Sequence, residues 1–138
     1  MDIVFLIGRV LFAALMLGSA FAHFAQAKPM TGFAQSKGVP AAAAGVFVGG
    51  VLLALGGLSV LLGIWADLGA LLLVAFLLPT AFLMHGFWKE ADPMARQMEM
   101  IQFQKDTALA GAALFFFALY SIAGTDAGLT ITGPLFGS

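Results

Sequence analysis

Hydrophobic positions along the chain fall into four long runs, separated by three connectors that are short, mixed or charged. The runs cover residues 3–25, 39–64, 68–87 and 107–123. Each is near the length of about 20 apolar residues that a helix needs to cross a hydrocarbon core about 30 Å thick. The pattern predicts four membrane-spanning helices, and therefore an all-α, integral membrane four-helix bundle.

The three connectors differ in length and character. Residues 26–38 form the first, the tripeptide Trp65-Ala66-Asp67 the second, and residues 88–105, which carry several charges, the third. The tail, residues 124–138, is rich in Gly and Thr and is expected on the surface without a regular element. Nothing in the sequence indicates a soluble module, so we expect a single transmembrane domain over residues 1–138.

The third connector has helical character of its own. Asp92 can cap a helix and Pro93 suits its first turn. The apolar positions that follow are Met94, Met98, Ile101 and Phe103. We therefore expect a short helix that lies along the membrane interface between the third and fourth spans and covers a small pocket.

Composition supports a membrane location and excludes several functions. The chain is 62% hydrophobic and 9% charged, whereas a soluble domain is typically about a quarter charged. The lipid bilayer is thus the partner that the composition requires. A net charge of −1 argues against nucleic acid, and the absence of Cys excludes disulfides and thiolate chemistry.

The first run is interpreted as a retained helix. The segment SAFAHFAQAKP offers a signal-peptide-like cleavage site after Ala27. No positive charge precedes the apolar stretch, however, because Asp2 stands there, and Arg9 interrupts the run. Both features are unlike a signal peptide.

Basic residues gather on one side of the predicted bundle. An even number of spans places both termini on one side and the first and third connectors on the other. The connector side holds Lys28, Lys37, Lys89, Arg96 and Lys105. The positive-inside rule then predicts that this side is cytoplasmic and that both termini lie outside the cytoplasm.

Small residues at helical spacing predict close packing between helices. The stripes are Gly49, Gly56 and Gly63 in the second run, Ala14, Gly18 and Ala22 in the first, and Ala108, Gly111 and Ala112 in the fourth. Pro79 removes a backbone donor from the third run and should kink it.

Arg9 is a charge inside an apolar run. It lies about six residues, or roughly 9 Å, into the first helix, where a charge marks a candidate functional site. The alternative is that it reaches the lipid headgroups or pairs with a carboxylate of the same side, Asp2, Asp67 or Asp126. If Arg9 is paired, we expect its guanidinium within hydrogen-bond reach of a carboxylate or a backbone carbonyl on the termini side. Asp67 is the preferred partner, because it opens the third span at that level.

Five polar or aromatic side chains are predicted at one membrane boundary: His23, His85, Trp88, Lys105 and Asp106. They form either an ordinary interfacial belt or a headgroup pocket. In a pocket, His and Lys would hydrogen-bond a quinone carbonyl, and His and Asp would exchange its protons. Trp88 and Phe87 would stack on the quinone ring.

Other cofactors fit these residues less well. A b-type haem needs two facing imidazoles, which only His23 and His85 could supply. A zinc site would have to combine the same two histidines with Asp106. We therefore expect no metal site and regard haem b as a poor fit.

The sequence resembles the DoxX/DoxD-like family of small four-helix membrane proteins. The similarity lies in GFAQSKGVP (32–40), LGGLSVLLG (55–63), TAFLMHGFW (80–88), DP (92–93) and FQKDTALAGAAL (103–114). Arg9 falls where the family often has an early Arg. Leu53 stands where a Glu is common, and Asp106 where the family commonly has Asn after Lys.

The resemblance implies a quinone-linked function, since family members are linked to thiosulfate:quinone oxidoreductase and other membrane redox assemblies. No anion site for thiosulfate is visible here. We expect a small integral membrane subunit associated with a quinone-linked respiratory or redox complex in a bacterial cytoplasmic membrane. The alternative is a structural or assembly subunit of a larger complex or homo-oligomer. Catalysis by the chain alone is not expected, because it has no flavin, metal-cluster or nucleotide motif.

Overall fold

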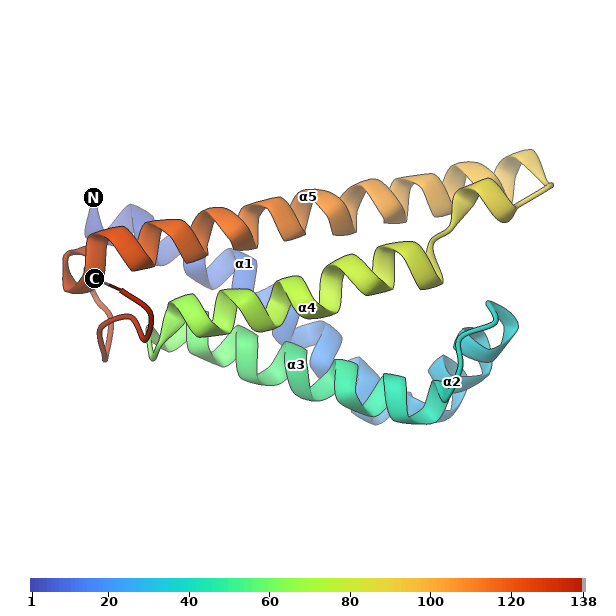
Figure 1. Cartoon of the computed structure of the whole chain (residues 1–138), viewed down its shortest axis with the longest axis horizontal. Helices are drawn as coiled ribbons and strands as arrows, with labels where there is room; N and C mark the ends of the chain where they lie inside the picture. Colours follow the sequence, from blue (N-terminus) through green and yellow to red (C-terminus); the bar gives the residue numbers. More distant parts are fainter. Residues whose placement is uncertain (138) are drawn as a thin grey trace.

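Helices make up nearly all of the structure, a computed structural model that describes residues 1–137 (Figure 1). The elements are α1 (Asp2–Ala25), α2 (Ala27–Ser36), α3 (Ala42–Leu62), α4 (Ala66–Met84), η1 (Phe87–Lys89), α5 (Pro93–Ala123) and η2 (Gly124–Ala127). Within residues 1–137 there is no strand. The predicted all-α class is confirmed.

Four of the helices, α1, α3, α4 and α5, are long and apolar enough to cross a membrane. They run alternately in opposite directions, so both termini lie at one end of the bundle (Figure 1). The other end carries α2 and the α4–α5 connection. The four predicted spans are thus confirmed, and the chain is an integral membrane protein.

Neighbouring spans pack in the order α1, α3, α4, α5, with most contacts between successive members. The buried core combines one or more side chains from each span, among them Met16, Leu53, Leu73 and Ala113. Helices α1 and α5 meet through aromatic rings, since Phe5 lies 5.6 Å from Tyr120 and Phe12 lies 5.0 Å from Phe116 (ring centroids).

The glycine stripe of α3 is where the helices approach most closely. A Cβ on Gly56 would lie 2.7 Å from the side chain of Leu73 and 2.9 Å from the carbonyl oxygen of Gly69, both on α4. Gly49 similarly accommodates the rings of Phe76 and His23. The packing predicted for this stripe is confirmed at Gly49 and Gly56, whereas Gly63 follows the end of α3 and lies against Thr130 of the tail.

The stripes predicted on the first and fourth spans mostly face away from the bundle, although Ala22 and Ala112 are half-buried. Ala14, Gly18, Ala108 and Gly111 are all exposed. The inward face of α1 consists of Arg9, Ala13, Met16 and Ala20, and that of α5 includes Asp106, Ala110 and Ala113. The prediction failed because residue size alone does not determine which side of a helix faces the bundle.

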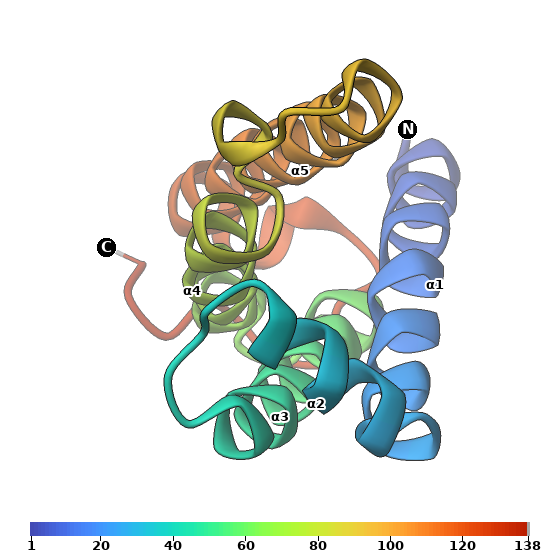
Figure 2. The ribbon, with the colours of Figure 1, turned by 90° about the vertical axis from the view of Figure 1, so that its right-hand side faces the viewer.

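The first connector contains a helix that the sequence interpretation missed. Only Gln26 separates α2 from the end of α1, and α2 crosses the ends of α1 and α3 (Figure 2). Pro29 is tolerated because it lies in the first turn, where its missing N–H has no intrahelical acceptor. Met30, Phe33 and Ala34 follow at helical spacing and form one apolar face.

The short interfacial helix expected in the third connector is not a separate element. Its residues form the first turns of α5, which runs unbroken for 31 residues from Pro93. The expected cap is present, because the Asp92 carboxylate accepts a hydrogen bond of 2.9 Å from the N–H of Ala95. Within residues 1–137, the only element between α4 and α5 is η1, a 3-10 helix of three residues.

The length of α5 locates the membrane boundary. Thirty-one residues span about 46 Å, which exceeds the hydrocarbon core of about 30 Å. If Ala123 lies at one boundary, the core ends about 20 residues earlier, near Phe103. The N-terminal third of α5 then projects beyond the core on the α2 side.

Candidate functional site

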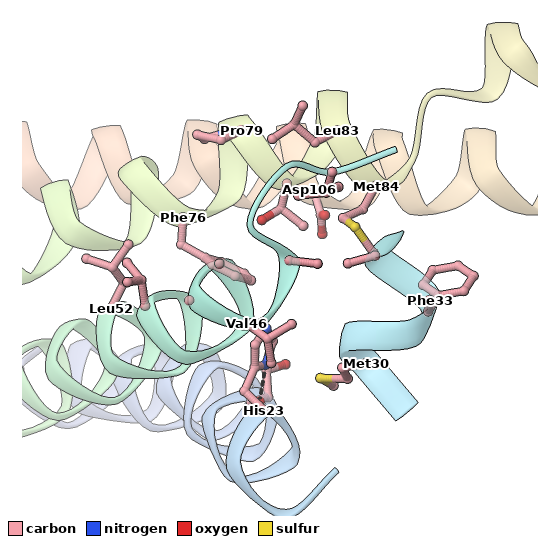
Figure 3. Close-up of a pocket in the computed structure, with 18 of the residues that line it drawn as sticks. His23, Met30, Phe33, Val46, Leu52, Phe76, Pro79, Leu83, Met84 and Asp106 are labelled. Atoms are coloured by element: carbon pink, nitrogen blue, oxygen red, sulfur yellow. Dashed lines mark hydrogen bonds between the residues drawn. The ribbon is translucent and has the colours of Figure 1, made fainter. Parts of the chain in front are cut away.

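A pocket of about 560 Å³ opens between α2, α3 and α4 (Figure 3). Its walls are mainly apolar: Met30 and Phe33 of α2 lie across the space from Val46 and Leu52 of α3 and from Leu83 of α4. Helix α2 therefore covers the pocket, rather than the segment 92–103 that the sequence suggested.

Four of the five predicted pocket residues line this cavity. His23, His85, Lys105 and Asp106 all contribute to its wall. They come from α1, the end of α4 and α5, so three distant parts of the sequence meet at one level. The prediction that these residues lie at one depth is consistent with this arrangement; whether they bind a cofactor is considered below.

Trp88 does not line the pocket. Its indole packs against Phe82, Phe87 and Phe103, with ring centroids 6.1, 5.3 and 5.6 Å away. This aromatic cluster lies at the boundary inferred from the length of α5, where Trp is typically enriched. Trp88 and Phe87 are thus placed to anchor the η1 turn at the interface and not to stack on a pocket ligand.

His23 is held by its own helix. Its Nδ1 lies 2.7 Å from the carbonyl oxygen of Ser19, one turn earlier. A carbonyl only accepts, so Nδ1 carries the proton and Nε2 of the neutral ring is an acceptor. The ring packs edge-on against Phe76 (5.4 Å between centroids), in the space left by Gly49.

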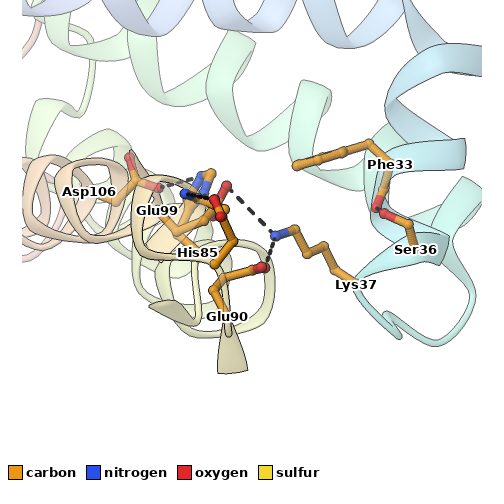
Figure 4. A network of polar contacts seen from close by, with 9 residues as sticks. Phe33, Ser36, Lys37, His85, Glu90, Glu99 and Asp106 are labelled. Carbon is orange, nitrogen blue, oxygen red and sulfur yellow. Dashed lines mark hydrogen bonds and ion pairs between the residues drawn. The ribbon is translucent and has the colours of Figure 1, made fainter. Parts of the chain in front are cut away.

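His85 belongs to a polar network at the end of α4 (Figure 4). Its Nδ1 lies 2.8 Å from Oε2 of Glu99, and its Nε2 lies 3.7 Å from Oδ2 of Asp106. The imidazole therefore stands between two carboxylates of α5. His23 and His85 thus each bond to groups of their own surroundings, Ser19 and Glu99.

The network continues to the connector between α2 and α3. The ammonium of Lys37 lies 2.9 Å from Oε1 of Glu90 and 3.7 Å from Oε1 of Glu99. These ion pairs join the C-terminal end of α2 to α5 and to the residue after η1. They hold α2 in place over the pocket.

Three members of this network, Lys37, Glu90 and Glu99, were not predicted from the sequence. One signal was available for Glu99: it precedes Asp106 by seven residues, which is two helical turns and hence the same face of α5. Lys37 and Glu90 have no such signal, because their contact depends on how α2 and η1 approach each other.

Pro79 also affects the pocket wall. Proline has no N–H, so the carbonyl of Ala75 lacks its usual partner four residues on. Ala75, Pro79 and Thr80 all line the pocket. The predicted kink of α4 stays a prediction, because α4 continues as one helix through Pro79.

Lys105 reaches back along α5, where its Nζ donates a hydrogen bond of 2.7 Å to Oε1 of Gln102.

Arg9 lies at the opposite end of the bundle and is fully buried (0% exposed). Its Nε donates to the carbonyl of Val60 (3.0 Å) and its Nη2 to that of Leu61 (2.7 Å). Its Nη1 donates to the carbonyls of Leu129 (3.0 Å) and Gly128 (3.4 Å). The guanidinium thus binds the last turn of α3 and the tail.

The predicted Arg9–Asp67 pair is not formed. Asp67 is also fully buried, but its two oxygens accept the backbone N–H groups of Leu135 (2.8 Å) and Phe136 (2.6 Å). The other predicted acceptor, a backbone carbonyl on the termini side, is the one that the structure shows. The final carbonyls of α3 have no intrahelical donors and are free to accept from the guanidinium. The tail, expected to lie on the surface, is fastened by both residues.

No group of three or more metal-ligating side chains is found in the part of the chain that the structure describes.

The fold and these sites define a small four-span membrane protein with an amphipathic pocket at one end. The family model for DoxX matches residues 4–86, more than half of the chain. The chain therefore belongs to the DoxX family. The match includes the segments 32–40 and 55–63, whereas the segment 103–114 lies outside it. No curated protein and no solved structure matches the chain significantly.

Proposed function

We propose that this DoxX-family protein binds a quinone in the pocket between α2, α3 and α4, as a small subunit of a quinone-linked redox complex in a bacterial cytoplasmic membrane. The observation that carries the proposal is the placement of His85. Its ring is oriented by Glu99 and lies beside Asp106 in the wall of an otherwise apolar cavity.

The size and polarity of the pocket fit a lipid-soluble ligand with a polar head. Ligand pockets typically have volumes of about 300–1,000 Å³ and a few polar groups among apolar walls. The cavity of about 560 Å³ meets both conditions. Its apolar walls suit a prenyl chain, whose other end would remain in the bilayer.

The polar groups suit a quinone headgroup specifically. A quinone has two carbonyl acceptors and becomes a hydroxyl donor when it is reduced. Lys105 is a donor in both states, whereas an imidazole and a carboxyl group such as those of His85 and Asp106 can each accept or donate a proton. A plain fatty acyl chain has no polar atoms that could use these groups.

The test is a substitution that places a larger side chain in the wall of the pocket and so reduces its volume. Gly45 lines the pocket, and a Cβ there would meet nothing within 4 Å. Gly45→Leu should therefore occupy ligand space without disturbing helix packing. Titration of a short-chain ubiquinone into the protein in nanodiscs should show an affinity reduced at least about tenfold, or 1.4 kcal/mol.

Gly8→Leu is the matched control. Gly8 is also helical with open space around its Cβ, but it lies on α1 at the termini end. This variant should bind the ubiquinone as the wild type does. His85→Ala should lower the affinity while the thermal unfolding of the bundle is unchanged. Equal binding by both glycine variants, or wild-type binding no greater than that of empty nanodiscs, would overturn the proposal.

A second candidate function is an assembly subunit without a redox role, and one observation favours it. Small residues of α1 and α5, including Ala14, Gly18 and Ala108, face away from the bundle and would let another membrane helix approach closely. Purification in a mild detergent followed by identification of bound proteins tests this function. It is supported if Gly18→Leu releases the partner and Gly45→Leu does not.

A further inference from the structure

The imidazole of His85 connects two carboxylates that differ in their surroundings. Asp106 lines the pocket, and its side chain is 9% exposed. Glu99 does not line the pocket, and its side chain is 15% exposed. On α5 the two are separated by seven residues, about 10 Å along the helix axis.

With Ala123 at one membrane boundary, the other boundary passes between these two carboxylates. The length of α5 places it near Phe103, and the aromatic cluster of Phe82, Phe87, Trp88 and Phe103 lies at that level. Asp106 is thus about one turn inside the hydrocarbon core, and Glu99 about one turn outside it. His85 bridges the two sides.

We infer that Asp106, His85 and Glu99 form a proton pathway between the pocket and the aqueous phase on the α2 side. The inference rests on the proposed function, because it assigns the route by which a pocket quinone exchanges protons. The groups that act are two carboxylates and one imidazole, the side chains best suited to proton transfer near neutral pH.

The transfer balances at each atom. Reduction of a quinone to a quinol takes two electrons and two protons, and the pathway delivers the protons one at a time. A proton from water enters on Glu99 and passes to Nδ1 of His85, Nε2 gives its own proton to Asp106, and Asp106 passes it to a quinone oxygen. The ring has then changed from the Nε2–H to the Nδ1–H tautomer, and it must rotate before it carries the second proton. Proton release on quinol oxidation runs in the opposite direction and restores the first tautomer.

The two steps differ in geometry. The Glu99–His85 distance of 2.8 Å is a direct hydrogen bond. The His85–Asp106 distance of 3.7 Å exceeds one, so a small side-chain rotation or one bridging water must complete this step. Electrons are outside the pathway and come from the redox partner.

The imidazole lies between the carboxylates of Glu99 and Asp106, and three further charged groups lie near these two. Glu99, Lys105 and Asp106 of α5, Lys37 after α2 and Glu90 after η1 together carry two positive and three negative formal charges. One added proton makes the group neutral. The network can therefore hold a transferred proton without a net charge at the membrane boundary.

Voltammetry of the protein in nanodiscs on an electrode, with a short-chain ubiquinone bound, tests the pathway. The electrode supplies electrons, so the rate at which bound quinone is reduced reports proton delivery. His85→Ala should lower this rate about 100-fold, and imidazole added to the buffer should restore part of it. The wild-type rate should be slower in D₂O, and the variant should lose that isotope effect.

Glu99→Gln and Asp126→Asn form a pair of test and control. Both replace a carboxylate by an amide, but only Glu99 contacts His85, whereas Asp126 is exposed in η2 at the termini end. The pathway predicts slow reduction in Glu99→Gln and an unchanged rate in Asp126→Asn.

Three results would overturn the inference, and they are distinguishable. Bound quinone whose reduction is equally fast in wild type and Glu99→Gln would refute the pathway alone, as would equal slowing in Glu99→Gln and Asp126→Asn. Absence of any bound-quinone signal above empty nanodiscs would refute the pathway and the proposed function together.

Discussion

The guanidinium of Arg9 donates a hydrogen bond of 2.7 Å to the carbonyl oxygen of Leu61. This contact joins the first turns of α1 to the last turn of α3, where carbonyls have no intrahelical donors. A positive charge is also favourable there because the dipole of a helix is negative at its C-terminus. Arg9 thus stabilises the packing of α1 against α3 at the end of the bundle where both termini lie.

Replacement of Arg9 by Met should destabilise the bundle. The variant keeps an apolar side chain of similar length but leaves the carbonyls of Val60, Leu61 and Leu129 without the charged donor. A loss of about 3 kcal/mol is expected, which corresponds to roughly 10 °C in Tm. Thermal unfolding in detergent measures it. Arg96→Met is the control, because Arg96 is exposed on α5; equal Tm values in the two variants would contradict the assignment.

The number of spans could be read from the sequence because it depends on composition over long segments. Four apolar runs of the right length leave few alternatives once the chain is in lipid. Helix α2 was missed because it has only ten residues and begins one residue after α1. The unbroken α5 was missed because a charged segment resembles a connector, whereas a helix longer than the core can continue into water.

The level of a residue along the bundle was predictable from its position in the chain. The direction in which its side chain points around the helix axis was not. Chain position placed His23, His85 and Asp106 at one depth, and all three line the pocket. The same reasoning placed Trp88 there, and the structure turns it toward Phe82 and Phe103 instead. For Arg9, a backbone acceptor at the termini end was predictable, but the preferred partner Asp67 was wrong. Its carboxylate binds the N–H groups of the tail, and the sequence does not show where the tail lies.

Replacing a glycine at the α3–α4 contact by alanine should lower the stability of the protein, whereas the same change at an exposed helical glycine should raise it. A Cβ on Gly69 would collide with the side chain of Ser59, and one on Gly56 would press on Leu73. Gly56→Ala and Gly69→Ala should each lose about 1–3 kcal/mol. Gly111→Ala, with nothing within 4 Å, should gain about 0.5–1 kcal/mol through helix propensity. Chemical unfolding of the three variants decides; a gain at Gly69 would show that the helices are not in close contact there.

Asp67 should control the order of the C-terminal tail. Its carboxylate accepts the N–H groups of Leu135 and Phe136, and Asn would offer one acceptor and one amide group in the same place. Asp67→Asn should weaken the attachment of the tail by about 1–3 kcal/mol without changing the helix content. The readout is the rate of carboxypeptidase digestion. Asp126→Asn, at an exposed position, should digest at the wild-type rate, and an unchanged rate in Asp67→Asn would refute the role.

The orientation of the bundle is open to a direct test. Both termini lie at one end and α2 and η1 at the other (Figure 1), and five of the six Lys and Arg residues belong to the α2 end. The positive-inside rule therefore places the α2 end in the cytoplasm, where protons for the proposed pathway would originate. Alkaline phosphatase fused after Ser138 should be active, because it folds only when exported, and the same enzyme inserted after Gly38 should be inactive. The reverse pattern would place Glu99 and Lys37 outside the cytoplasm and change the source of the protons, although the hydrogen bonds themselves would be the same.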